Sequence, residues 1–139
     1  MDERFADQTV IRRMLWDSQT WAFVGLSDNP TRTVYDQARL LQERGKKIIP
    51  VHPGRAPVLG EQAYGSLAEV PVPIDVVGVY RRADSAGEVV DEAIRAGAKG
   101  VWLPLDVVDV AAAERALEAG LEVVMDRCPA VEWSLRHRR

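Results

Sequence analysis

The segment WAFVGLSDNPTRT, residues 21–33, decides the fold. Trp21–Val24 is a short apolar run of the kind found in strands, and Gly25 follows it at the position of a turn. Polar residues then lead to Thr33, which together with Asp36 fits the capping pattern at the start of a helix. A strand, a glycine turn and a helix in this order are typical of a parallel α/β sheet.

The rest of the chain repeats this alternation. We expect further strands over Lys47–Val51, Ile74–Tyr80, Gly100–Leu103 and Glu122–Met125, and a weaker one near Gln62–Tyr64. These runs are apolar nearly throughout, as in parallel strands that helices cover on both faces. The sequence therefore predicts a single-domain α/β fold: a doubly wound, Rossmann-like parallel sheet of about five to six strands with helices on both faces.

Helices are expected between these strands. Ser85 and Glu88 form a second capping pattern, and an alanine-rich helix is expected over Asp109–Ala119. Three helices should end at a glycine, namely Gly45, Gly97 and Gly120. Residues 1–19 are expected to contribute an N-terminal helix, over Asp7–Trp16, that packs on a domain formed by residues 20–139.

Composition argues against several classes of partner. A net charge of −3 over 139 residues provides no basic surface for nucleic acid, and no apolar run reaches the roughly 20 residues that cross a bilayer. One cysteine and an N-terminus without a signal-peptide pattern favour the cytoplasm. His52 and His137 are far apart in the sequence, so no metal site is expected, and Arg136–Arg139 is expected to be a solvated tail.

In a doubly wound sheet the ligand binds beyond the carboxyl ends of the strands, so the residues that directly follow each strand are the candidates. After the first strand these are Gly25, Ser27, Asn29, Arg32 and Thr33. They offer main-chain N–H groups, a helix N-terminus and a guanidinium, all of which suit a phosphate. The alternative is a polar loop that Thr33 merely caps.

The second strand ends in VHPGR, residues 51–55, where His52 and Pro53 leave room for a flat base and Arg55 can reach a phosphate. This chain lacks the dinucleotide fingerprint G-x-G-x-x-G, because Ser27 and Pro30 stand where glycines are required. It also lacks the acidic residue that would bind the ribose of a nicotinamide cofactor after this strand. NAD is therefore disfavoured, while Arg55 leaves an opening for NADP.

The fourth strand ends at Tyr80, Arg81 and Arg82. Tyr80 is expected to pack in the core rather than stack on a base. Successive residues of an extended chain point opposite ways, so we expect one arginine to face the ligand and the other to meet solvent or a carboxylate. The alternative is a solvated arginine pair beside Asp84 and Glu88.

No catalytic apparatus is predicted. The nucleophile elbow G-x-S-x-G and the Walker phosphate loop are both missing from the sequence. Cys128 has no histidine near it in the sequence and is expected to be an inert thiol in the core. Trp102 is expected to be a packing residue rather than a ligand platform.

These residues together resemble the small stand-alone CoA-binding domain proteins, relatives of the N-terminal domain of the succinyl-CoA synthetase alpha subunit. The resemblance covers about Thr20 to Val131 and rests on an ordered set of motifs: Val24–Ser27 with Pro30 and Arg32, Pro50–Pro53, Ser66–Leu67, Ile74–Val77, Tyr80–Arg82, Val101–Leu103 and Met125–Pro129. It implies that coenzyme A (CoA) or acyl-CoA lies across the strand ends. By that resemblance the phosphates would meet Gly25, Ser27, Asn29 and Arg32, the nucleotide end would meet His52, Pro53 and Arg55, and the other wall would be Tyr80, Arg81 and Arg82.

The sequence departs from that family in three places. Phenylalanine is common where Tyr80 stands, and asparagine is common where His52 stands. Leu103–Asp106 replaces a leucine–glutamine–x–glycine pattern, so Pro104 removes a backbone donor and Asp106 adds a negative charge near a polyanion. The histidine that is phosphorylated in succinyl-CoA synthetase belongs to a second domain absent from these 139 residues, so the resemblance implies binding without ligase activity.

The leading hypothesis is therefore a non-enzymatic module that binds CoA or acyl-CoA, as a carrier, a sensor or the partner of a larger acyl-CoA enzyme. An NAD(P)-dependent oxidoreductase domain and a ligand-free interaction subunit are the alternatives. The sequence leaves the acyl group and the oligomeric state open.

Overall fold

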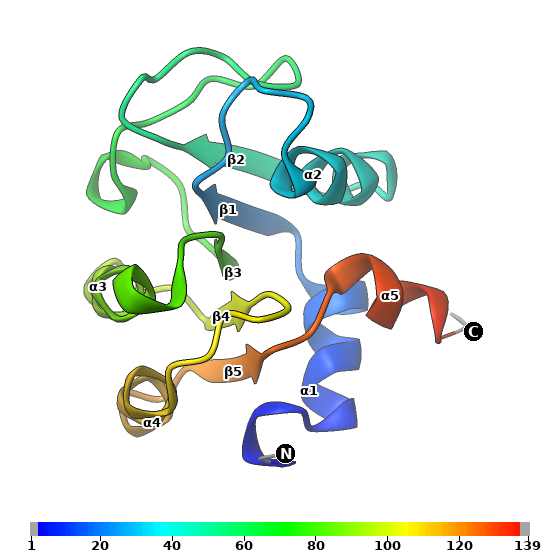
Figure 1. The fold of residues 1–139 in the computed structure, drawn as a ribbon, viewed down its shortest axis with the longest axis vertical. Helices are drawn as coiled ribbons and strands as arrows, with labels where there is room; N and C mark the ends of the chain where they lie inside the picture. Colours follow the sequence, from blue (N-terminus) through cyan, green and yellow to red (C-terminus); the bar gives the residue numbers. More distant parts are fainter. Residues whose placement is uncertain (1–2, 137–139) are drawn as a thin grey trace.

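A computed structural model of the chain describes residues 3–136. It contains five strands, β1 (Thr20–Val24), β2 (Lys47–Val51), β3 (Val76–Val79), β4 (Gly100–Leu103) and β5 (Glu122–Met125). They form one parallel sheet in the order β2-β1-β3-β4-β5 (Figure 1). The predicted Rossmann-like α/β fold is confirmed.

Helices cover both faces of the sheet (Figure 1). On one face lie α3 (Ala83–Arg95) and α4 (Val110–Glu118), and on the other lie α1 (Gln8–Arg12), α2 (Thr33–Glu43) and α5 (Pro129–Ser134). A π-helical turn over Arg13–Asp17 continues α1, and short 3-10 turns occupy Glu3–Phe5 and Leu67–Glu69. Across residues 3–136, every helix is too short or too polar to span a membrane.

Each strand sends alternate residues to the two faces, which explains why the strands are apolar throughout. In β1, Trp21 and Phe23 face the side of α1, α2 and α5, whereas Ala22 and Val24 face α3 and α4. Every strand residue is buried except the first residue of β1, of β2 and of β5. Trp102 of β4 is fully buried and donates from Nε1 to the Arg127 carbonyl at 2.8 Å, so its predicted packing role is confirmed.

Two strand predictions need correction. Residues 62–64 form no strand, because only Tyr64 pairs with the sheet, through an isolated bridge to Val51. They belong instead to one long connection over residues 52–75 that leads from β2 to β3. The strand expected over Ile74–Tyr80 is shorter at both ends and covers Val76–Val79.

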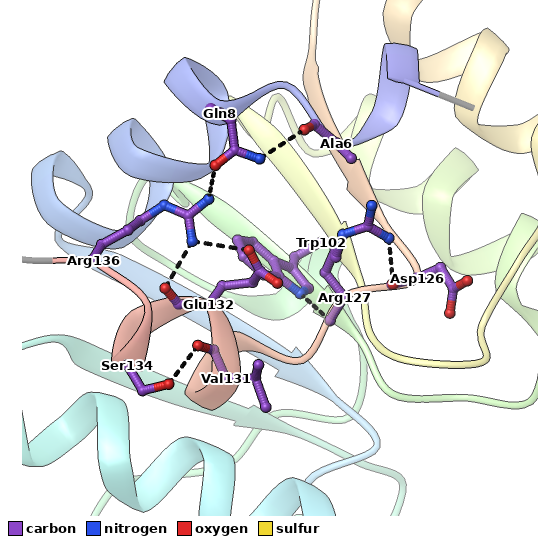
Figure 2. Close-up of polar contacts among 9 residues, drawn as sticks. All are labelled: Ala6, Gln8, Trp102, Asp126, Arg127, Val131, Glu132, Ser134 and Arg136. Carbon is purple, nitrogen blue, oxygen red and sulfur yellow. Dashed lines mark hydrogen bonds and ion pairs between the residues drawn. The ribbon is translucent and has the colours of Figure 1, made fainter. Parts of the chain in front are cut away.

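The segment after β5 also differs from expectation, because α5 has no counterpart among the predicted helices. Arg136, just beyond α5, has a side chain only 6% exposed and pairs with Glu132 at 2.9 Å. It also donates to Gln8 of α1 (Figure 2). The predicted solvated tail is therefore wrong for Arg136, since a buried carboxylate compensates its charge. Residues 137–139 lie outside the described residues.

Candidate functional site

A cavity of about 730 Å³ opens at the carboxyl edge of the sheet, a size typical of small-molecule sites. The sheet order reverses between β1 and β3, because α2 leads from β1 to β2 on one side and α3 leads from β3 to β4 on the other. This is the topological switch point where doubly wound sheets bind ligands. The lining residues follow four strands: Arg32, Thr33, Val34 and Gln37 after β1; Tyr80, Arg81, Arg82 and Ser85 after β3; Pro104, Leu105, Asp106 and Val107 after β4; and Cys128 and Pro129 after β5.

Gly25 allows the loop after β1 to pass the end of β3. Its φ is +105°, and a Cβ atom there would lie well inside van der Waals contact with the Tyr80 carbonyl oxygen. Its N–H donates to the Val51 carbonyl at 2.9 Å, while the Tyr80 N–H donates to the Val24 carbonyl at 3.0 Å. Gly25 therefore shapes the site from outside the cavity lining.

The first turns of α2 and α3 differ from prediction in a way that matters for binding. Thr33 and Ser85 were expected to cap these helices, but the N-cap residues are Arg32 and Arg82, and neither helix start has a side-chain cap. The prediction was wrong because Thr33 is already the first residue of α2, and Ser85 lies inside the first turn of α3. Both uncapped starts border the cavity, so their N–H groups can serve an anionic ligand.

Three arginines line the same cavity. Within residues 3–136, the side chains of Arg32 and Arg81 form no ion pair or hydrogen bond. Arg82 pairs with Asp84 at 3.1 Å, and both of these side chains are largely exposed. One of the two adjacent arginines thus meets a carboxylate, as expected, and the cavity keeps two uncompensated guanidinium groups.

The polar side chains of the loop after β1 mainly form hydrogen bonds within the loop. Asn29 Oδ1 accepts from the Thr31 N–H at 3.0 Å and from its hydroxyl at 2.7 Å. Ser27 Oγ accepts from the Asn29 N–H at 3.4 Å. Neither Ser27 nor Asn29 lines the cavity.

The predicted residues after β2 are not brought to the cavity either. His52 is 8% exposed, and its Nε2 lies 3.1 Å from the Ala56 carbonyl oxygen. Arg55, at a φ of +57°, donates to Glu69 at 2.6 Å. This hydrogen bond, with another from the Gly65 N–H, lowers the pKa of the Glu69 carboxyl. His52, Pro53 and Arg55 are thus set apart from the lining residues.

The loop after β4 was expected near the ligand through the resemblance, but its residues were left out of the candidate site, and Cys128 was misplaced. Cys128 was expected in the core, but it is half-buried and lines the cavity because it directly precedes α5. Its Sγ lies 3.6 Å from Oε1 of Gln37, which also accepts from the Ala130 N–H at 3.0 Å. The rule that ligands lie after each strand could have added residues 104–107 and 128–129 to the candidates.

Comparison with known proteins shows the family of this chain. Residues 19–134 match the CoA binding domain family. The chain belongs to this family. Over 118 residues it is 37% identical to the uncharacterized protein YneT of Bacillus subtilis, covering 85% of this chain and 87% of that relative.

Solved structures agree with the family fold. A hypothetical protein from Pyrococcus horikoshii matches with a TM-score of 0.87 at 34% identity, covering 92% of this chain and 90% of that one. A Thermus thermophilus protein matches with a TM-score of 0.86 at 28% identity, covering 93% and 98%. A dinucleotide-forming acetyl-coenzyme A synthetase of Ca. Korarchaeum cryptofilum shares the fold, with a TM-score of 0.72 at 22% identity over 84% of this chain and 27% of that one.

Tyr80, just after β3, lines the cavity. Its ring packs on Phe23 with centroids 5.6 Å apart, so the expected packing role is confirmed. Its hydroxyl is buried and has no hydrogen-bond partner among residues 3–136. Burial, followed by the neighbouring Cys128, raises the pKa of this phenol far above its ordinary value of 10.0, so it stays protonated.

Proposed function

We propose that this protein binds CoA or acyl-CoA non-covalently in the cavity at the carboxyl edge of the sheet. One observation carries the proposal: two uncapped helix starts and the guanidinium groups of Arg32, Arg81 and Arg82 border a single cavity. Main-chain N–H groups at helix starts and arginine forks are the groups that bind phosphate. Membership of the CoA binding domain family supports CoA as the phosphate-bearing ligand.

The proposal includes no covalent chemistry on the ligand. His52 lies off the cavity, and His137 lies outside the described residues. Tyr80 remains protonated, and Cys128 contacts an amide oxygen rather than a base. Among residues 3–136, no group of three or more His, Cys, Asp or Glu side chains could hold a metal ion. A cytoplasmic carrier, sensor or partner of an acyl-CoA enzyme fits this set of groups.

Thermal unfolding with a panel of nucleotides tests the proposal. The panel contains CoA, acetyl-CoA, dephospho-CoA, NAD, NADP and ATP. A ligand at 100 times its dissociation constant stabilises the fold by about 2.7 kcal/mol, which gives a clear shift in Tm. CoA and acetyl-CoA should give the largest shifts, and dephospho-CoA a smaller one because it lacks the 3′-phosphate.

Two arginines of the same chain region provide the matched variants. Arg32→Ala should reduce the CoA shift because Arg32 lines the cavity without an ion pair. Arg39→Ala should leave the shift unchanged, since Arg39 is an exposed α2 residue paired with Asp36 outside the cavity. A larger shift with NADP than with CoA would show that the proposal is wrong.

A further inference from the structure

The cavity changes character along the sheet edge. Its arginines follow β1 and β3, whereas four of the residues that follow β4 and β5 are apolar: Pro104, Leu105, Val107 and Pro129. We call these four residues the apolar wall. Because β3 lies between β1 and β4, the arginines lie on the β1–β3 side of the cavity and Pro104, Leu105 and Val107 lie on its β4 side. The residues on either side of Pro129 contact Gln37 of α2.

Leu105 is the most exposed member of the apolar wall, with 59% of its surface accessible. Its turn is held from both sides, because the Val107 N–H donates to the Pro104 carbonyl at 3.0 Å and the Asp106 N–H donates to Asp126 at 2.7 Å. Leu105 is therefore kept on the cavity by a hydrogen-bonded turn. Covering this side chain with an apolar group would remove its surface from water and stabilise the complex.

Asp106 restricts which part of a ligand can occupy the β4 side of the cavity. Its carboxylate is exposed beside Leu105 and lines the cavity, so it repels phosphate groups. The phosphates of a bound CoA should therefore lie on the arginine side, and the uncharged end of the molecule should reach the apolar wall. In CoA that end is a thiol, and in an acyl-CoA it is the thioester with its acyl chain.

We infer that the natural ligand is an acyl-CoA with an aliphatic chain, and that the apolar wall binds the chain. This inference rests on the proposed function and names the ligand class for the same cavity. Free CoA leaves Leu105 exposed, whereas the acyl chain covers it. Affinity therefore rises with chain length until the apolar wall is filled.

Calorimetric titration of the full chain with CoA, acetyl-CoA, butanoyl-CoA and hexanoyl-CoA tests the inference. Affinity should increase along this series by up to about four-fold for each methylene that becomes fully buried. Leu105→Ser should flatten the series, so that acetyl-CoA, butanoyl-CoA and hexanoyl-CoA bind with similar affinities. Leu117→Ser is the control, because Leu117 is an exposed apolar residue of α4 outside the cavity, and it should leave the series intact.

The outcomes separate this inference from the proposed function. If CoA binds but hexanoyl-CoA binds no more tightly, the inference is wrong and the proposed function stands. If the chain-length dependence persists in Leu105→Ser, the apolar wall does not bind the acyl chain and the inference is also wrong. Failure of all four ligands to bind would instead overturn the proposed function.

Discussion

The loop after β1 and the connection after β2 share three residue types but have different roles. Each carries glycine, proline and an arginine directly beyond a buried strand. Arg32 of the β1 loop lines the cavity without an ion pair, whereas Arg55 of the β2 connection bonds Glu69. The difference shows that Arg32 can meet a ligand without breaking an ion pair, whereas Arg55 would first have to leave Glu69.

The largest expected effect is on stability, and it compares one glycine from each of the two regions. Gly25→Ala should lower the free energy of unfolding by roughly 3 kcal/mol or more, because the new Cβ meets the Tyr80 carbonyl at a φ of +105°. Gly60→Ala, in the β2 connection, should lower it by about 1–2 kcal/mol, since its φ is +78° but no atom lies within 4 Å. Urea denaturation measures both, and equal losses would contradict the comparison.

The next effect concerns ligand affinity. Arg81→Ala should weaken CoA binding about ten-fold or more, because a desolvated charge-assisted contact contributes roughly 1.5–3 kcal/mol. Arg55→Ala should change the affinity less than about two-fold, since Arg55 is committed to Glu69. Calorimetry on both variants is the measurement. A comparable loss in Arg55→Ala would mean that Arg55 leaves Glu69 when the ligand binds.

A smaller effect, of opposite sign, is expected at Tyr80. Tyr80→Phe should raise the free energy of unfolding of the unliganded protein by about 1 kcal/mol, because it removes a buried hydroxyl without a partner. Tyr64→Phe, in the β2 connection, should be close to neutral, since Tyr64 has no such buried orphan hydroxyl. If Tyr80→Phe destabilises the protein, an ordered water bonds that hydroxyl in solution.

The smallest effect is a pH dependence confined to the β2 connection. Arg55 lowers the pKa of folded Glu69 below its ordinary value of 4.5. This contribution to stability is therefore present above the unfolded pKa and is lost as the pH falls through the lower folded value. Comparing Tm at about pH 6 and about pH 3 should show a smaller acid-induced decrease in Arg55→Ala than in the unmodified protein. Identical decreases would exclude the Arg55–Glu69 pair as a contributor.

Burial explains which parts of the fold could be predicted. The five strands were predictable because nearly every strand residue is buried, which leaves uninterrupted apolar runs in the sequence. The helix starts at Arg32 and Arg82 were placed wrongly, because capping patterns beginning at Thr33 and Ser85 indicated later starts. A capping pattern reflects only the local preference of the sequence for a helix start, whereas packing against the sheet decides where the helix begins.

The site could be predicted in part for a related reason. Five of the predicted residues line the cavity because they follow strands of a doubly wound sheet: Arg32, Thr33, Tyr80, Arg81 and Arg82. The position of Arg55 depends on Glu69, which is 14 residues away and reaches it only through the folded connection. A contact of this kind leaves no pattern in the sequence.

The bond between Arg136 and Gln8 joins the two ends of the described chain near the helix that borders the cavity (Figure 2). Pro129 at the start of α5 and its N-cap residue Cys128 line the cavity, while Arg136 beyond the last turn of α5 donates to Gln8 of α1. A fragment trimmed to residues 19–134, the stretch shared with the family, would lose both partners of that bond. Such a fragment would therefore match the family along its whole length and still lack a contact that holds α5, beside the cavity, against α1.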